Sequence, residues 1–352
     1  MSRIVVGMSG GVDSAVCAYL LKMAGHDVIG VTLRTQVSDT RCCEIDEARI
    51  VADQLGFPYY VKSMIYEFGT YVTDPFIQEY LAARTPNPCT VCNRLIKWDG
   101  LLAMADSLGA QYVATGHYAR VERLENGRCT VRQADSKTKD QTYFLYQLTQ
   151  QQLSRTIMPL GTLDKPKVRR IAEAAGIMVF DKPDSQEICF IEDGETYADY
   201  IEDHIEDEEA AVRPGNFVSE DGTVLGTHQG LIHYTIGQRK GLGLAMGEPV
   251  YVKELRPDTN EVVIAPDEAL YASSLLCGDL HFMAIEDLPI GESRRADVKI
   301  RYRHTAQPAT LTRLSDAALR VDFDEPVRAI APGQAAVFYE NGYVLGGGVI
   351  RR

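Results

Sequence analysis

The amino-acid sequence predicts an α/β N-terminal domain built on a parallel sheet, followed by two small β-rich domains of which the last is barrel-like. Up to about residue 180, short β-rich runs alternate with amphipathic helical stretches, as in βαβ units whose helices cover both faces of a parallel sheet. From Arg213 onward, alternating strands broken by glycine-containing turns dominate. The length of 352 residues allows two or three domains with a substantial core.

The elements expected in the first part follow from its apolar runs and helical periodicity. The final helix, KPKVRRIAEAAGI, has a proline near its start and a glycine just past its end, as helices commonly do. In chain order, the expected elements are the strand IVVG, a helix over 12–24, the strand HDVIGVTL, a helix over 44–54, the strand FPYYVKSM, a helix over 66–82, a helix over 94–108, the strand AQYVAT and that final helix.

The second part has turn signals about every 8–12 residues, which is typical of small barrel-like or sandwich-like β domains. No helix longer than about ten residues is expected there. Changes in character near residues 200 and 270 divide the chain into domains 1–200, 201–270 and 271–352. The expected strands lie within GNFVSEDG, YVKELRPDTNEVVIA, ATLTRLSDAALRVDFDEP and AAVFYENGYVLGGGVI.

The net charge of -13 does not exclude a nucleic-acid partner, because the acidic excess is local. Residues 181–210 contain 13 acidic residues and one lysine, so the remainder of the chain is close to neutral. Within that remainder, RRADVKIRYRH at 294–304 is a compact basic stripe. Such a stripe suits either RNA phosphates or a solvated strand face.

Composition indicates a cytoplasmic protein with no membrane partner. The N-terminal MSRIVVGMSGGVDS does not resemble a signal peptide, and no stretch reaches the roughly 18 apolar residues that span a bilayer. Eight cysteines in such a chain are interpreted as thiols rather than as a disulfide framework. The expectation is that Cys17, Cys129 and Cys277 are buried, and that Cys42 and Cys43 have a structural or incidental role. Three cysteines remain as candidates for chemistry: Cys89, Cys92 and Cys189.

The segment MSGGVDSAV directly follows the first expected strand and opens the first expected helix. A strand, a glycine loop and a helix N-terminus together present backbone N–H groups to a phosphate. The segment lacks the lysine and hydroxyl of G-x-x-x-x-G-K-[ST], and it also differs from G-x-G-x-x-G. A turn that only packed strand against helix would leave Ser9, Asp13 and Ser14 unexplained.

Residues 9–14, SGGVDS, resemble the loop of the PP-loop ATP pyrophosphatases, which share the adenine nucleotide α-hydrolase-like fold. That superfamily cleaves ATP between the α- and β-phosphates and moves AMP onto a carbonyl or carboxylate. The resemblance implies that the loop cradles pyrophosphate, that Asp13 helps to place Mg²⁺, and that Leu33 and Gly116 frame adenine and ribose. The residues expected to bind ATP are Gly7, Met8, Ser9, Gly10, Gly11, Val12, Asp13, Ser14, Leu33 and Gly116.

The loop does not identify the acceptor of AMP. Asparagine synthetases, GMP synthetases, argininosuccinate synthases and lysidine synthases share it. The amide-forming members need an ammonia source, and the sequence shows no glutaminase domain. The acceptor therefore has to be inferred from other segments.

The spacing Cys89-x-x-Cys92 within TPNPCTVCNRLIKW fits a metal site, a disulfide-exchange pair or a sulfur carrier. A structural zinc site normally takes four ligands, and no second C-x-x-C is present. A thioredoxin-type pair would open a helix without flanking prolines. The prolines are expected to keep Cys89 outside regular helix. A helix starting near Arg94 is expected to lower the pKa of Cys92 through its dipole.

Five stretches resemble the tRNA-specific 2-thiouridylases of the bacterial type. They are TPNPCTVCNRLIKW, ATGHYARV with SKTKDQTYFLYQL, DSQEICFI, HQGLIHYTIGQRKGLGL and FDEPVRAIAPGQAAVFY, within matches that run in order from residue 4 to residue 350. In that family, ATP adenylates O2 of the wobble uridine at position 34 of tRNA, and persulfide sulfur replaces the oxygen with release of AMP and pyrophosphate. An amide-forming or lysidine-synthase-like adenylating ligase is the alternative.

The resemblance also implies roles for the three cysteines. Cys189 would carry the persulfide and Cys92 would be the second catalytic thiol, so the segment with Cys189 must fold over the site. A cysteine desulfurase or a sulfur-relay protein is implied as the donor. Some family members have aspartate and others cysteine in place of Cys89, whose role stays open. An iron–sulfur cluster on all three cysteines is an alternative, because three thiolates leave one iron free to hold sulfide; no other metal site is expected.

A base in a stacked anticodon loop must be flipped out before its C2 can react. The resemblance implies that Asn87 and Pro88, beside the cysteines, contact that base. Arginine suits phosphate contact and tyrosine suits base stacking. The residues expected to contact tRNA are Asn87, Pro88, Cys89, His117, Lys139, Asp140, Gln141, Arg301, Tyr302 and Gln334.

Overall fold

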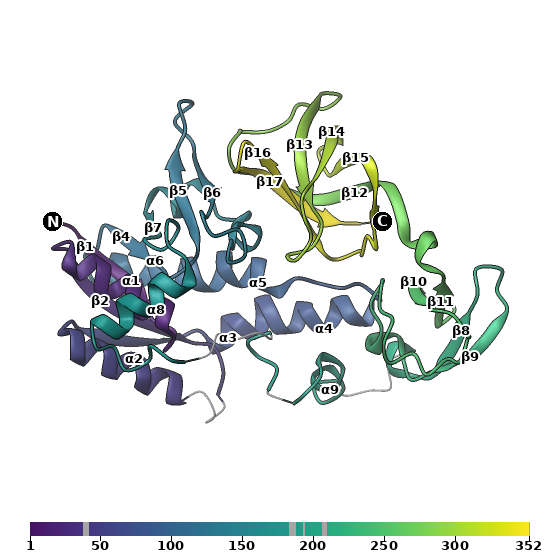
Figure 1. Cartoon of the computed structure of the whole chain (residues 1–352), viewed down its shortest axis with the longest axis horizontal. Helices are drawn as coiled ribbons and strands as arrows, with labels where there is room; N and C mark the ends of the chain where they lie inside the picture. Colours follow the sequence, from purple (N-terminus) through teal and green to yellow (C-terminus); the bar gives the residue numbers. More distant parts are fainter. Residues whose placement is uncertain (38–41, 183–187, 193, 206–209, 352) are drawn as a thin grey trace.

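The structure is a computed structural model that describes residues 1–37, 42–182, 188–192, 194–205 and 210–351. It comprises an N-terminal α/β body, a small four-stranded sheet and a β-barrel that contains the C-terminus (Figure 1). Within the described residues, no helix is long and apolar enough to cross a membrane.

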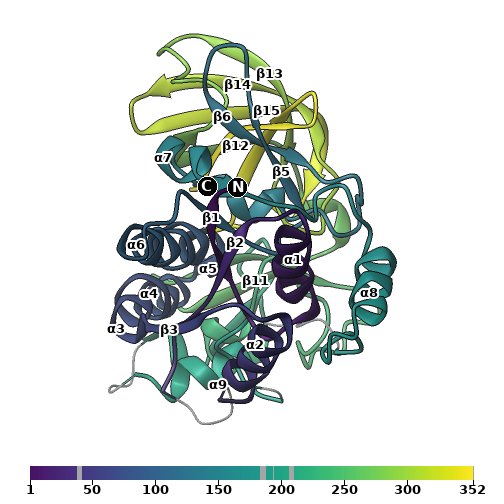
Figure 2. The same ribbon diagram turned by 90° about the vertical axis from the view of Figure 1, so that its left-hand side faces the viewer.

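The α/β body is built on a five-stranded parallel sheet of order β3-β2-β1-β4-β7. The strands are β1 (Arg3–Gly7), β2 (Asp27–Arg34), β3 (Tyr59–Ser63), β4 (Tyr112–Ala114) and β7 (Thr156–Ile157). Helices α1 (Val12–Met23), α2 (Cys42–Leu55) and α8 (Lys165–Ala174) lie on one side, and α6 (Asp99–Ser107) lies on the other (Figure 2). The predicted parallel sheet covered on both faces is therefore confirmed.

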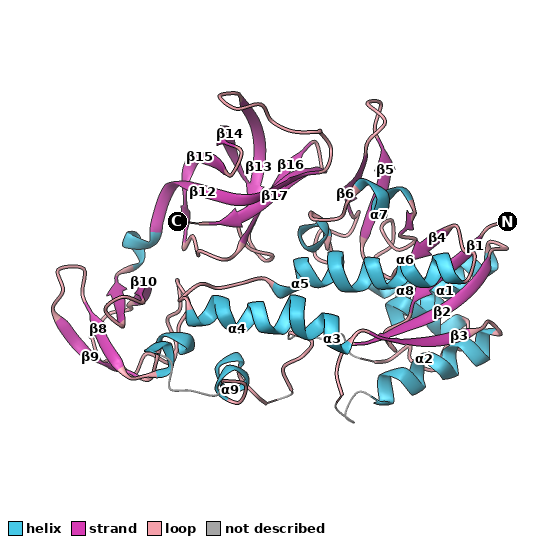
Figure 3. Ribbon diagram, turned by 180° about the vertical axis from the view of Figure 1, so that it is seen from behind, coloured by secondary structure: helices cyan, strands magenta, loops and turns pink. Residues whose placement is uncertain are grey.

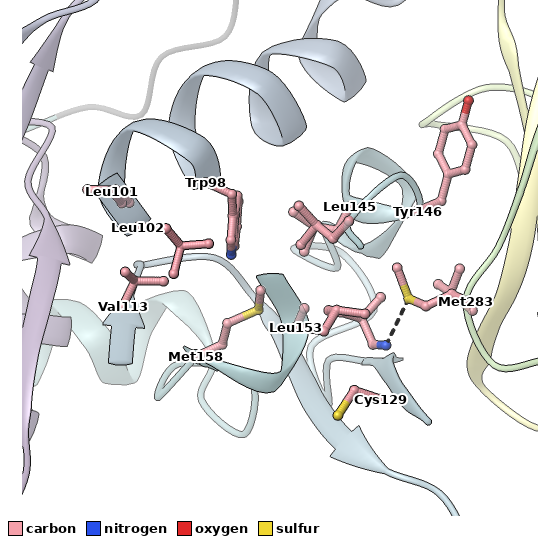
Figure 4. Packing of buried hydrophobic residues seen from close by; sticks show 14 of the residues in the cluster. Trp98, Leu101, Leu102, Val113, Cys129, Leu145, Tyr146, Leu153, Met158 and Met283 are labelled. Carbon is pink, nitrogen blue, oxygen red and sulfur yellow. Dashed lines mark hydrogen bonds between the residues drawn. The ribbon is translucent and has the colours of Figure 1, made fainter. Parts of the chain in front are cut away.

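The alternation of side chains along β1 separates two buried cores. Ile4 and Val6 pack in the cluster that includes α1, α2 and α8, whereas Val5 points into the cluster with Trp98 of the α6 side. The second cluster continues into the barrel, because Met283 belongs to it and its sulfur accepts the backbone N–H of Val131 at 3.3 Å (Figure 4). The α/β body and the barrel thus share one apolar core.

Two long helices lie side by side between the α/β body and the β domains, and both contain a π-helical segment (Figure 3). The first consists of α3 (Ile65–Phe68), η2 (Gly69–Thr73) and α4 (Asp74–Leu81), and the second of α5 (Pro88–Val91), η3 (Cys92–Trp98) and α6. The first agrees with the helix expected over 66–82.

The second helix corrects two expectations. It begins at Pro88 rather than near Arg94, because proline is tolerated at the first helical position, where its missing N–H needs no partner. Cys89 therefore lies inside the first turn, and the prediction that it stays outside regular helix is wrong.

A hairpin of β5 (Ala119–Arg123) and β6 (Cys129–Gln133) follows the fourth strand of the body and was not predicted. It joins the sheet of the barrel through the pairing of Arg132 with Tyr343. Short helices η4 (Thr142–Leu145) and α7 (Gln150–Ser154) then lead back to the parallel sheet.

The β-rich part has two units, as predicted. A four-stranded sheet of order β10-β11-β8-β9 comes first, and a closed barrel follows, in which β12 pairs with both β15 and β17. The sheet strands are β8 (Gly215–Val218), β9 (Val224–His228), β10 (Tyr251–Arg256) and β11 (Glu261–Ala265), flanked by α9 (Tyr197–Glu202), η5 (Ala210–Val212), η6 (Leu231–His233) and η7 (Asp267–Leu270). The barrel strands are β12 (Tyr271–Phe282), β13 (Ser293–Lys299), β14 (Gln307–Ser315), β15 (Ala318–Arg328), β16 (Ala335–Glu340) and β17 (Tyr343–Ile350). The predicted fold class is confirmed.

Candidate active site

The glycine loop connects the end of β1 to the start of α1. Gly10 has φ 70°, a conformation that favours glycine, and Gly11 occupies the N-cap position without a side chain that could accept from the first helical amides. The hydroxyl of Ser14 accepts the backbone N–H of Ser9 at 3.2 Å and donates to the Gly11 carbonyl at 3.0 Å. The loop is thereby held in shape while the helix N-terminus stays available to an anion.

The loop lies where the strand order reverses between β1 and β4, the position at which open α/β sheets bind ligands. Gly116, just past β4, approaches α1 so closely that a Cβ on it would lie 2.7 Å from the carbonyl carbon of Asp13. Leu33 is the next-to-last residue of β2, at the same edge of the sheet, and the Thr32 hydroxyl beside it donates to the Met8 carbonyl at 2.7 Å. The residues expected to bind ATP are therefore brought to one edge.

Asp13 has two partners that the sequence interpretation missed. Its carboxylate accepts the hydroxyl of Tyr118 at 2.8 Å and the ammonium of Lys165 at 2.8 Å from each oxygen. Lys165 is 8% exposed and opens α8. A single carboxylate at this place fits Mg²⁺, which is usually bound by one or two carboxylates together with substrate phosphates.

Cys92 starts the π-helical segment and is buried. Burial raises the pKa of its thiol to about 12, and the smaller opposing effect of the Lys97 charge does not compensate. The prediction of a lowered pKa is therefore wrong: the helix begins at Pro88, Cys92 lies past its first turn where the dipole effect fades, and desolvation dominates.

Cys89 lies three residues before Cys92, and Phe190, next to Cys189, packs in the same buried cluster as Cys92. The pKa of the half-buried Cys89 is also raised, chiefly by desolvation, and the nearby Cys189 contributes to the raised pKa of both other thiols. Cys189 itself is exposed. The adjacent Phe190 is buried against Phe68 and Phe76, with ring centroids 5.7 and 5.1 Å away, and this packing fixes the backbone next to Cys189.

These thiols do not form a ligand set for a metal cluster in the present arrangement. Among the described residues, no group of three or more His, Cys, Asp or Glu side chains is positioned to hold a metal ion. In this arrangement, the described residues therefore do not fit an iron–sulfur cluster.

The remaining cysteines are consistent with a structural role. Cys17, Cys129 and Cys277 are buried, as predicted, and burial raises the pKa of Cys17 and Cys277. The side chains of Cys42 and Cys43 lie outside the described residues.

The segment before the cysteines is fixed by the barrel. The Gln334 amide donates to the carbonyls of Thr85 at 3.1 Å and Pro86 at 3.4 Å, and the Tyr143 hydroxyl, beside Asn87, donates to the Ala335 carbonyl at 2.8 Å. Pro88 is buried and Asn87 half-buried at the start of α5. The barrel thus positions the residues expected to contact the target base.

The other residues expected to contact tRNA are half-buried or buried around this place. His117 lies 5.4 Å from the Trp98 ring, and burial, followed by the Lys97 charge, lowers its pKa to about 3, so its imidazole is neutral. Asp140 accepts from the Ala134 amide and the Thr142 hydroxyl at 2.9 and 2.7 Å.

Lys139 precedes Asp140 and is half-buried, and Gln141 accepts the Tyr118 backbone N–H at 2.9 Å. On the barrel, Tyr302 packs on Phe144 with ring centroids 4.4 Å apart. Arg301 donates to backbone carbonyls on both sides of a domain junction. Polar groups of Asp140, Gln141, Arg301 and Gln334 thus already have partners inside the protein.

Three family models match the chain in succession. They are described as "tRNA methyl transferase HUP domain" over residues 2–193, "tRNA methyl transferase PRC-barrel domain" over 198–266 and "Aminomethyltransferase beta-barrel domain" over 272–350. The "tRNA-specific 2-thiouridylase MnmA" of Lachnoclostridium phytofermentans is 49% identical and aligns over 99% of both chains. The proteins of the same name from Clostridium perfringens (strain 13) and Carboxydothermus hydrogenoformans are each 46% identical over 99% of this chain and 98% of their own.

The chain belongs to the tRNA-specific 2-thiouridylase family. The resemblance inferred from the glycine loop and the cysteine segments is thus confirmed along the whole chain. Among solved structures, the "U34-tRNA thiolase NcsA from Methanococcus maripaludis with its [4Fe-4S] cluster" aligns over 53% of this chain and 60% of its own, with 20% identity. The TM-score between the two structures is 0.37.

Proposed function

We propose that this chain replaces O2 of the wobble uridine at position 34 of tRNA with sulfur, consuming ATP and releasing AMP and pyrophosphate. The observation that carries the proposal is that Cys92 packs in the same buried cluster as Phe190, the neighbour of Cys189, within a chain whose glycine loop suits ATP. A lysidine-synthase-like ligase would need neither thiol.

The first half of the reaction is activation of the base. O2 of the flipped uridine attacks the α-phosphate of ATP, and the bond to the β-phosphate breaks. The amides at the start of α1 and the hydroxyls of Ser9 and Ser14 would receive the pyrophosphate. When bound with ATP, Mg²⁺ would offset phosphate charge, and Asp13 is the carboxylate placed to hold it.

The second half is sulfur transfer. The terminal sulfur of a Cys189 persulfide attacks C2, and the oxygen leaves on AMP. The Cys92 thiolate then attacks the Cys189 sulfur of the mixed disulfide, which releases 2-thiouridine and leaves a Cys92–Cys189 disulfide for an external thiol reductant. The charge of Lys97 offsets only part of the rise that burial causes in the pKa of Cys92, so the Cys92 thiol has to lose its proton as it attacks.

The partners follow from exposure and position. Cys189 is exposed, which suits loading by a cysteine desulfurase or a sulfur-relay protein in the cytoplasm. Asn87, Pro88 and Cys89 would contact the flipped base. The surrounding tRNA would lie against His117, Lys139, Asp140, Gln141, Arg301, Tyr302 and Gln334.

The proposal is tested by deleting the gene and measuring the nucleosides of bulk tRNA by mass spectrometry. Loss of 2-thiouridine from position 34, restored by the intact gene, is the expected result. Unchanged 2-thiouridine would reject the proposal, and loss of a lysidine instead would favour the alternative ligase.

A further inference from the structure

Lys165 places a positive charge at the phosphate end of the glycine loop, although the loop itself contains no lysine. Its ammonium contacts both carboxylate oxygens of Asp13 at 2.8 Å, across 152 positions of sequence. Lys165 is 8% exposed, so the charge lies inside the site rather than in solvent. A cation held this way acts on its neighbours with little screening.

The location of Lys165 is unusual for a cation. It is the first residue of α8, where the helix dipole disfavours positive charge, and its N-cap Asp164 accepts the backbone N–H of Lys167. A buried lysine at such a position needs compensation, which Asp13 provides in this structure. The ion pair with Asp13 explains how the buried charge of Lys165 is tolerated. It does not explain why a lysine stands at the start of α8.

Asp13 does not depend on Lys165 for its orientation. The hydroxyl of Tyr118 donates to Asp13 at 2.8 Å and would hold the carboxylate if the ammonium moved. Asp13 itself lies in the first turn of α1, so its negative charge opposes an incoming triphosphate. A lysine on a flexible four-carbon chain can neutralise the carboxylate first and the phosphate afterwards.

We propose that Lys165 is the pyrophosphate-binding cation of this site: it pairs with Asp13 in the free enzyme and contacts the β-phosphate of the leaving group when ATP is bound. The inference rests on the ATP half of the proposed function and is independent of sulfur transfer. Lys165 supplies from α8 the charge that other phosphate loops carry within the loop.

The test measures binding of inorganic pyrophosphate, and separately of AMP, by calorimetry in EDTA, so that no metal ion takes part. Lys165→Met should weaken pyrophosphate binding at least tenfold and change AMP binding less than twofold. Lys165→Arg should recover part of the loss. Lys167→Met is the matched control, because that side chain is exposed on the same helix, and it should bind both ligands like the unaltered protein.

The double variant Asp13→Asn with Lys165→Met covers the case in which Lys165→Met leaves an unpaired carboxylate and fails to fold. It should bind pyrophosphate at least tenfold more weakly than Asp13→Asn alone. Equal binding by these two variants, or an equal loss of AMP and pyrophosphate affinity in Lys165→Met, would show that the pair is only structural. Because neither tRNA nor sulfur is present, such a result would leave the proposed thiolation untouched.

Discussion

The guanidinium of Arg301 donates to the carbonyl of Ile236 at 2.8 Å, which ties the barrel to the central β domain. A second bond to the Ala329 carbonyl at 3.0 Å fixes the same group within the barrel. Burial lowers the pKa of Arg301, yet its guanidinium stays charged at neutral pH. The residue therefore joins two domains beside the surface expected to bind tRNA.

Replacing Arg301 with alanine should weaken tRNA binding about tenfold and reduce the slope of log affinity against log salt by about one, because one phosphate contact is lost. Filter binding over a salt series measures both quantities. Arg3→Ala is the control. It removes an arginine at the N-terminal end of β1, and it should change neither the tRNA affinity nor the salt slope. If thermal stability falls while the tRNA dissociation constant and salt slope stay constant, Arg301 is only a domain contact.

Labelled ATP with substrate tRNA should yield AMP and pyrophosphate and no ADP, because residues 9–14 resemble the loop of enzymes that cleave between the α- and β-phosphates. Asp13→Ala should reduce AMP formation at least about 100-fold while tRNA binding stays nearly intact. Thin-layer separation of the labelled products shows which nucleotide forms and how fast, and filter binding measures the tRNA affinity. ADP as the main product would contradict the assignment of the loop.

Gly116→Ala should greatly reduce AMP formation, because its Cβ would lie 2.7 Å from the Asp13 carbonyl carbon and push the start of α1 away. The crowding should also cost about 1–3 kcal/mol of the free energy of unfolding. Gly69→Ala is the control: apart from its chain neighbours and its own helix backbone, no described atom lies within 4 Å of the added Cβ, and its activity should be unchanged. Normal activity in Gly116→Ala would mean that the close approach is dispensable.

Serine in place of Cys92 or Cys189 should abolish 2-thiouridine formation, while adenylation of tRNA survives because it needs only the loop. Cys89→Ser should keep substantial activity with a persulfide donor, since Cys89 is expected to be a contact to the base. Cys129→Ala, a buried cysteine away from the site, serves as the control. An iron-containing protein, prepared without oxygen, that loses both iron and activity in Cys89→Ser would instead support the cluster.

The rate of alkylation by iodoacetamide should depend on pH differently for Cys189 and Cys92. At pH 8 the exposed Cys189 should react, whereas Cys92, with a pKa of about 12, should react slowly and about tenfold faster per pH unit up to that value. Because the pKa is raised from 9.0 on folding, the contribution of Cys92 to stability is complete below pH 9 and declines between pH 9 and 12. Mass spectrometry of digested protein gives the rates, and equal rates for both thiols at pH 8 would contradict this.

Local sequence signals were enough to predict the parallel sheet, the bounds of the helices expected over 12–24, 44–54 and 66–82, and the β-rich character of the chain from Arg213 onward. The glycine loop was found because Ser9, Gly10 and Asp13 are contiguous. Lys165 and Tyr118 were not, because nothing near either residue indicates that the fold brings them to Asp13. Long-range contacts of this kind depend on how α8 packs against α1.

The start of the second long helix was misjudged for a local reason. Pro86 and Pro88 were taken to exclude helix, whereas a proline at the first position is compatible with it. The wrong expectation for the pKa of Cys92 followed directly, since burial in the cluster with Phe76 and Ile96 can be seen only in the folded chain.

The π-helical segment between Cys92 and Trp98 holds one residue more per turn than an α-helix would. Removing one residue there would therefore let the segment relax to α-helical form while its two ends keep nearly the same orientation. Trp98 would stay fixed by its bond to Thr156 at 2.6 Å. A one-residue deletion at this place should thus leave Cys92 facing the same cluster, which makes the extra residue a place where the chain can change length without moving the thiol.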